Sequence, residues 1–260
     1  MLSARAFLVR GLLCGLLAGL ATFVTAFYVG EPHVQAAIDV EEAHAASEPP
    51  AAEESDGHAH EEDGTVVSRH DQRTWGLLTG SLGIGTALGG LTALVAAGAV
   101  GRIGRLRPAQ STALVALLGW VSISLVPFLK YPATPPAVGD EDTIGARTAE
   151  YFVLVLVSVV AAALCVILAR RLLSTSGTYI AVVAGAAAYL LAMVVVGQVL
   201  PTVDEIGDFP GDTLWYFRRA SVITTATLWA VLGVLLTGTI GRLHHQDTSR
   251  TARRALAASL

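Results

Sequence analysis

The chain has 260 residues, of which 53% are hydrophobic, and a formal net charge of −4 at pH 7. A mean hydropathy of +0.59 leaves almost no sequence for a soluble domain, and nothing in the composition points to a nucleic-acid partner. The single lysine, Lys130, is followed by Tyr131 and Pro132, which excludes an ATP-binding loop that ends in Lys-Ser or Lys-Thr. His60 and Glu61 begin like a zincin helix, but the second histidine four residues on is missing. We therefore expect no enzyme, no catalytic residues and no permanently bound cofactor.

Six apolar runs dominate the sequence, and none of them contains Asp, Glu, Lys, Arg or His. Each run is 19 to 26 residues long, which is enough to cross a hydrocarbon core about 30 Å thick at about 1.5 Å per helical residue. The runs predict an all-α, polytopic membrane protein with six transmembrane helices and a single membrane domain over residues 1–260. In chain order the predicted helices are 11–29, 75–100, 111–129, 151–169, 178–200 and 220–240.

Charged residues are segregated between the two sets of helix ends. Eleven of the 17 basic residues flank one set, whereas 20 of the 21 acidic residues lie in 30–74, 130–150 and 201–219. Because cytoplasmic loops carry the excess of Lys and Arg, both termini are predicted to be cytoplasmic. The three acidic stretches are then exterior, where their charge can concentrate cations near the lipid surface.

The first exterior stretch, residues 30–74, carries five of the seven histidines among many carboxylates. Its centre, 48–64, is rich in Ala, Pro, Glu and Asp and is expected to be disordered, whereas its ends are expected to be ordered. At one end, Glu31, Pro32 and His33 are predicted to close the first helix. Neutral imidazoles among carboxylates suit a divalent first-row cation, and a solvated acidic tether is the alternative interpretation. The candidate metal ligands are His33, His58, His60 and His70.

The second predicted helix is rich in glycine and contains a GxxxG pattern from Gly85 to Gly89. Small residues let helix backbones approach closely in a membrane, where no hydrophobic force drives helices together. This face is therefore expected to pack against another helix, in the same chain or in a partner.

Lys130 stands at the exterior end of the third predicted helix, where positive charge is disfavoured. Three prolines follow it, and they should make the segment after Lys130 stiff and extended. We expect Lys130 to have an acidic partner, either in 140–142 or in the pair Asp204 and Glu205.

The fifth predicted helix and the loop after it supply the remaining candidates for a cation entrance. Gln198 is the only amide in any predicted span, and it either hydrogen-bonds another helix or lines a cation path. A stiff proline loop that faces an acidic loop at the helix ends can form an entrance of fixed geometry. The candidate entrance residues are Lys130, Gln198, Asp204 and Glu205.

Several segments together resemble the CbtA family of predicted cobalt transporter subunits, nearly from end to end. They are GEP at 30–32, PFLKYPATPPAVG at 127–139, TIGART at 143–148, LPTVDEIGDFP at 200–210 and LWYFR at 214–218. The resemblance marks Lys130, Pro135, Pro136, Glu205 and Arg218 as family residues, and Thr134 stands where the family usually has Asn.

The resemblance implies a multi-pass protein of the bacterial cytoplasmic membrane that passes Co²⁺ inward as its substrate. It also implies a small single-span partner subunit with a histidine-rich tail. The first hypothesis is therefore an integral membrane subunit of a transporter that takes up cobalt or another divalent transition metal. In this hypothesis the exterior loop, which carries acidic residues and histidines, captures the cation. The alternatives are a metal-capture or assembly subunit without its own permeation path, and a transporter of a different solute.

Overall fold

The computed structural model describes residues 3–47, 67–136, 138–139 and 141–259. Within these ranges the chain forms helices joined by short connections, and no strand is present. The elements are α1 (Ala4–Thr25), η1 (Ala26–Gly30), α2 (Glu31–Ser47), α3 (Arg69–Asp71), η2 (Gln72–Gly76), α4 (Leu77–Ala99), α5 (Pro108–Gly119), η3 (Trp120–Leu125), α6 (Val126–Lys130), η4 (Glu141–Thr143), α7 (Ile144–Leu172), α8 (Gly177–Val199) and α9 (Gly211–Ala258). Of the η segments, η4 is a 3₁₀ turn and the other three are π-helical.

Six continuous helical stretches are long and apolar enough to cross a membrane, which confirms the predicted all-α architecture with six spans. Each stretch coincides with one of the predicted apolar runs, and most extend beyond it because helix-forming residues such as Ala, Glu and Arg flank the runs. The six stretches are Ala4–Ala46, Arg69–Ala99, Pro108–Lys130, Ile144–Leu172, Gly177–Val199 and Gly211–Ala258.

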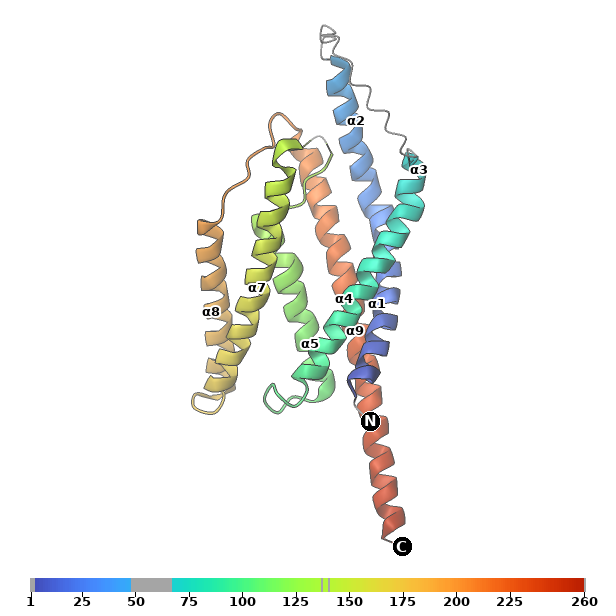
Figure 1. The fold of residues 1–260 in the computed structure, drawn as a ribbon, viewed down its shortest axis with the longest axis vertical. Helices are drawn as coiled ribbons and strands as arrows, with labels where there is room; N and C mark the ends of the chain where they lie inside the picture. Colours follow the sequence, from blue (N-terminus) through green and yellow to red (C-terminus); the bar gives the residue numbers. More distant parts are fainter. Residues whose placement is uncertain (1–2, 48–66, 137, 140, 260) are drawn as a thin grey trace.

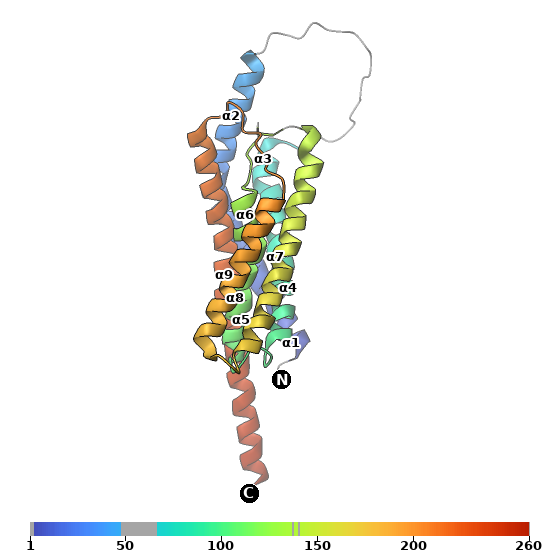
Figure 2. The ribbon, with the colours of Figure 1, turned by 90° about the vertical axis from the view of Figure 1, so that its left-hand side faces the viewer.

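Both ends of the chain lie at the same end of the helix bundle (Figure 1). There α9 continues well past the other helices, since its 48 residues make it about 72 Å long. At the opposite end lie α2, α3 and the connection from α8 to α9 (Figure 1, Figure 2). We call this opposite end the acidic end, because it carries the described parts of 30–74, 130–150 and 201–219.

Helices α1 and α4 make the closest contact between helices in the bundle. Gly11, Gly15 and Gly19 of α1 face Gly85 and Gly89 of α4, and backbone atoms of each helix occupy the space that a Cβ on the other would need. The glycine-rich face predicted from the sequence therefore packs within the same chain, against a second row of glycines at the same four-residue spacing.

Helix α9 packs against α1 and α5 and completes the core of the bundle. Side chains from α1, α4 and α9 interlock there, and Trp120 and Ile123 of η3 pack against them. The buried core residues are Phe7, Cys14, Ala18, Ala93, Ala96, Leu228, Trp229, Leu232, Leu236 and Ile240.

Helices α7 and α8 form a hairpin at the side of this bundle (Figure 1, Figure 2). They are joined by a hydrogen bond of 2.7 Å between the hydroxyls of Ser158 and Tyr189, and α8 packs mainly on α7. Much of the rest of α8 presents exposed Leu and Val side chains, as expected of a surface that faces lipid. The hairpin meets the bundle through α7, which contacts η3 and α6.

The expectation that Glu31, Pro32 and His33 close the first helix is wrong. The helix instead continues through η1 into α2, so residues 31–47 of the predicted loop are helical. Proline removes one backbone donor and crowds the carbonyl four residues earlier, which is Tyr28 in this case and lies within η1. Pro127 stands in the same relation to η3, which shows that a π-helical turn accommodates each of these prolines without ending the helix.

Candidate functional site

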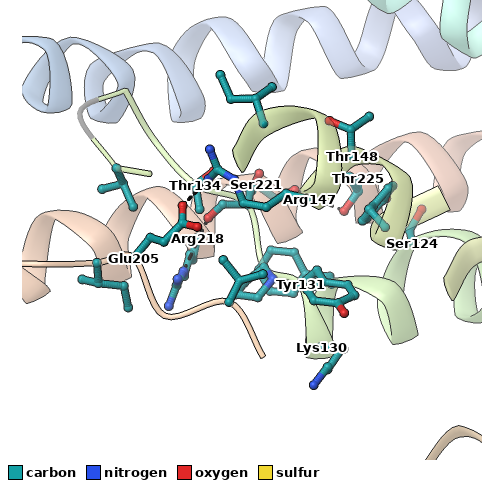
Figure 3. A pocket seen from close by; sticks show the side chains of 18 residues that line it. Ser124, Lys130, Tyr131, Thr134, Arg147, Thr148, Glu205, Arg218, Ser221 and Thr225 are labelled. Carbon is teal, nitrogen blue, oxygen red and sulfur yellow. Dashed lines mark hydrogen bonds and ion pairs between the residues drawn. The ribbon is translucent and has the colours of Figure 1, made fainter. Parts of the chain in front are cut away.

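A cavity of about 640 Å³ lies at the acidic end, where the α7–α8 hairpin meets the bundle. Its walls come from η3 and α6, the extended segment after Lys130, the first turns of α7, the segment before α9, and the first turns of α9 (Figure 3). Residues far apart in the sequence therefore share one space. Its polar lining is Ser124, Lys130, Tyr131, Thr134, Arg147, Thr148, Tyr151, Glu205, Arg218, Ser221 and Thr225.

Glu205 is held at the cavity wall by α7 and the turn before it. Its Oε2 accepts a hydrogen bond of 3.0 Å from the hydroxyl of Thr143. The same oxygen lies 3.4 Å from Nη1 of Arg147 (Figure 3). Both side chains of the ion pair are partly buried, with exposed fractions of 20% for Arg147 and 25% for Glu205. The pair fastens the loop before α9 to the first turn of α7.

Arg147 is itself positioned by Gly139, which has a φ of +108°. The Arg147 guanidinium lies directly against this glycine, in the space that a Cβ would occupy. Only glycine combines this backbone conformation with the absence of a side chain, so Gly139 allows Arg147 to reach the cavity.

Lys130 and Tyr131 connect the end of α6 to the same loop before α9. The Lys130 ammonium donates a hydrogen bond to the Thr202 hydroxyl at 3.5 Å and lies 5.6 Å from the centre of the Tyr131 ring. The Tyr131 hydroxyl donates to the carbonyl of Pro201 at 2.9 Å. Burial of the phenol, and then the charge of the nearby Glu150, raise the pKa of Tyr131 above its usual value of 10.0.

The acidic partner expected for Lys130 is not found in the described part of the chain, where no carboxylate lies within 4.0 Å of its ammonium. Asp140, within the expected stretch 140–142, lies outside the described residues. Glu205, one of the expected partners, pairs with Arg147 instead. The reason is geometric, because α7 begins seven residues before the predicted apolar run and so carries Arg147 to the cavity wall.

Arg218 contributes a second guanidinium to the cavity, from the second turn of α9. Its Nε donates to the carbonyl of Ala133 at 3.4 Å, in the extended segment after Lys130. Among the described residues, no carboxylate lies within ion-pair distance of this guanidinium.

The predicted entrance residues are divided between the cavity and the surface around it. Lys130 and Glu205 line the cavity, Asp204 is exposed beside Glu205, and Gln198 is exposed on α8 and is not part of the lining. The hydrogen bond to another helix considered for Gln198 is likewise not present among the described residues.

The candidate metal ligands do not converge in the described part of the chain. His33 is partly buried and stacks on the ring of Tyr216, with 5.7 Å between ring centres and an angle of 12°. His70 is exposed on α3, and His58 and His60 lie outside the described residues. No group of three His, Cys, Asp or Glu side chains able to hold a metal ion occurs within the described ranges.

Sequence reasoning missed the role of Arg147 and assigned none to Arg218. A usable signal was present, because only six of the 17 basic residues lie on the acidic side, and three of them line this cavity. Basic side chains at an otherwise acidic end of a membrane protein mark positions with a specific local role.

The model of the family described as probable cobalt transporter subunit (CbtA) matches residues 4–240, nearly the whole chain. The match includes every segment that lines the cavity. No curated protein and no solved structure matches the chain. The chain is therefore a multi-pass membrane protein that belongs to the CbtA family of probable cobalt transporter subunits.

Proposed function

We propose that this chain is the integral membrane subunit of a cobalt uptake transporter in the bacterial cytoplasmic membrane. Both termini are cytoplasmic in this proposal, and the acidic end is exterior. The observation that carries the proposal is the cavity at the acidic end, which joins Lys130 and Glu205 within a chain of a probable cobalt transporter family. Its position at the helix ends suits a substrate that arrives from the exterior and leaves through the helix bundle.

The proposal gives two different tasks to the exterior residues. The segment with His33, His58, His60 and His70 raises the local concentration of the divalent cation through weak, exchangeable binding. The cavity with Lys130 and Glu205 admits the substrate in a fixed geometry, and Asp204 contributes negative charge beside it. The proposal gives no part in the entrance to Gln198, which is exposed near the end of α8.

A partner subunit fits this proposal, since the family is described as a transporter subunit. A small single-span chain with a histidine-rich tail is the partner we propose. Its tail would supply imidazole ligands of the kind that do not converge within the described part of this chain.

A metal-capture or assembly subunit without its own path is the second candidate. It is favoured by the absence, among the described residues, of any cluster of three His, Cys, Asp or Glu side chains that could hold a metal ion within the membrane-crossing stretches. Reconstitution of the purified chain into liposomes separates the two candidates. Cobalt entry with the chain alone supports a permeation path in this subunit, whereas entry only with the partner present supports the second candidate.

The orientation is tested by labelling single cysteines in a background that lacks Cys14 and Cys165. A cysteine at Ser55 should react with an impermeant maleimide in intact cells, and one at Ser249 should react only after lysis. Labelling of Ser249Cys in intact cells would contradict the cytoplasmic placement of the termini and, with it, the exterior placement of the cavity.

A further inference from the structure

We infer that the cavity recognises the carboxylate groups of an anionic metal complex, so that the metal enters bound to a small polycarboxylate and not as a hydrated cation. This inference rests on the proposed function and specifies the substrate class of the same cavity.

The charge of the lining is the first reason. Among the described lining residues, Lys130, Arg147 and Arg218 are cationic, and Glu205 is the only acid. The carboxylate of Glu205 is already bound by Arg147 and by the Thr143 hydroxyl. A hydrated divalent cation would meet net positive charge in this space, whereas an anionic ligand would be attracted.

Arg218 is the residue best placed to bind such a ligand. A guanidinium has five N–H donors, and only the Nε of Arg218 has a partner in the described chain, the carbonyl of Ala133. Arg218 lines the cavity, and among the described residues no carboxylate lies within ion-pair distance of its guanidinium. Because guanidinium binds carboxylate through two parallel hydrogen bonds, a carboxylate ligand satisfies this side chain.

The size of the cavity is the second reason. A volume of 640 Å³ corresponds to about twenty water molecules at about 30 Å³ each, and it falls within the range of small-molecule sites. A bare ion requires ligands that converge to about 2 Å from it, and no group of three His, Cys, Asp or Glu side chains able to do so occurs in the described chain. The hydroxyls of Ser124, Thr148 and Ser221 add neutral hydrogen-bonding groups that suit the oxygen atoms of an organic ligand.

Two acids lie close to the lining: Asp204, which is exposed beside Glu205, and Glu150, which lies near the phenol of Tyr131. Exposed acidic residues that lie farther away contribute little to the potential inside the cavity, because the screening length at physiological ionic strength is about 8 Å. The arginines that form its wall act at direct contact, where screening is weak. A polycarboxylate such as citrate keeps a net negative charge in its one-to-one complex with a divalent cation, and it is the probe of choice.

The binding test uses the full-length chain in phosphatidylcholine nanodiscs and radiolabelled citrate with equimolar Co²⁺. Saturable binding is expected, and Arg218→Gln should weaken it about tenfold, as for the loss of a hydrogen bond to a charged group. Arg218→Lys should restore part of the affinity. Arg219→Gln is the matched control, since Arg219 lies over the ring of Tyr216, at 4.8 Å, and is not part of the lining.

Three results of this test would overturn the inference. They are no citrate binding, equal binding by the wild type and Arg218→Gln, and loss of binding when phosphatidylglycerol replaces phosphatidylcholine. The last result would assign the cavity to an anionic lipid headgroup.

Cellular uptake distinguishes failure of this inference from failure of the proposed function. With total cobalt fixed and citrate varied, uptake should follow the concentration of the complex and should fall in Arg218→Gln. Uptake that follows free Co²⁺ and is unchanged in Arg218→Gln would reject the complex as substrate and leave cobalt uptake standing. No uptake above the vector control, in any form of cobalt, would reject the proposed function itself.

Discussion

Oε2 of Glu205 lies 3.4 Å from Nη1 of Arg147, so that an ion pair links the loop before α9 to the first turn of α7. This contact joins two segments that are separated by the whole α7–α8 hairpin in the sequence. It therefore fixes one wall of the cavity at the point where the hairpin meets the bundle. Its main effect is on the shape and charge of the cavity, because partly exposed ion pairs contribute only about 0–1 kcal/mol to stability.

Replacement of Arg147 by Gln should therefore impair uptake more than it impairs folding. The expected change in the free energy of unfolding is about 1 kcal/mol or less, whereas cobalt uptake should fall clearly at saturating substrate. Thermal unfolding of the purified protein and uptake in cells measure the two effects. Arg147→Gln protein that unfolds far below the wild-type temperature would show that the pair is mainly structural.

Substitution of Gly139 by Ala should reproduce the uptake defect of Arg147→Gln. A Cβ at position 139 would displace the guanidinium, and the φ of +108° is unfavourable for any residue with a side chain. Gly207→Ala is the control for backbone strain alone, because Gly207 has a φ of +54° and open space around the position of its Cβ.

The two glycine variants are compared by uptake and by the amount of protein in the membrane. Gly207→Ala should retain most of the uptake. Equal loss in both variants would show that strain, and not the displacement of Arg147, explains the result.

The contact between α1 and α4 predicts a strong dependence on side-chain size. Gly15→Ala should destabilise the protein by about 1–3 kcal/mol, because its Cβ would collide with the backbone of Gly85, which cannot move aside easily. Gly80→Ala, on the same α4 helix, has no atom within 4 Å of the new Cβ and should be neutral or slightly stabilising. The stability of both variants is measured as their resistance to thermal aggregation in detergent. Equal stability of Gly15→Ala and Gly80→Ala would argue against the close contact between α1 and α4.

The phenol of Tyr131 should titrate above 10.0, since burial and then Glu150 raise its pKa. A raised pKa favours the protonated form in the folded state, so the associated stability is present below pH 10 and is lost as the pH rises through the folded pKa. Glu150→Gln should remove only part of the rise in the pKa of Tyr131, because burial of the phenol is the larger cause. The pKa of Tyr131 is measured from the phenolate absorbance that disappears in Tyr131→Phe. Asp247→Asn, in the C-terminal part of α9, should leave this pKa unchanged.

The sequence was sufficient to predict the six membrane-crossing helices, because apolar length and the absence of charge define them directly. Lys130 and Glu205 could be assigned to one region, since both follow helices that end on the acidic side. The participation of Arg147 was missed, because the predicted apolar run begins at residue 151 and the requirement for a run without charges left out the polar first turn of α7. The continuation of the first helix past Pro32 depends on the π-helical turn before it, which no local pattern revealed.

Uptake measured over a range of cobalt concentrations tests most directly whether the cavity is the entrance. Glu205→Gln and Lys130→Met should reduce uptake even at excess cobalt, because concentration cannot restore the ion pair of Glu205 with Arg147, which fixes the cavity wall, or the ammonium of Lys130, which lines it. Deletion of residues 47–64 should reduce uptake only when cobalt is limiting, since mass action can replace capture. Asp208→Asn, an exposed acid outside the lining, is the control and should resemble the wild type. Loss of uptake at all concentrations in the deletion, with silent substitutions at Glu205 and Lys130, would contradict the assignment of the entrance to this cavity.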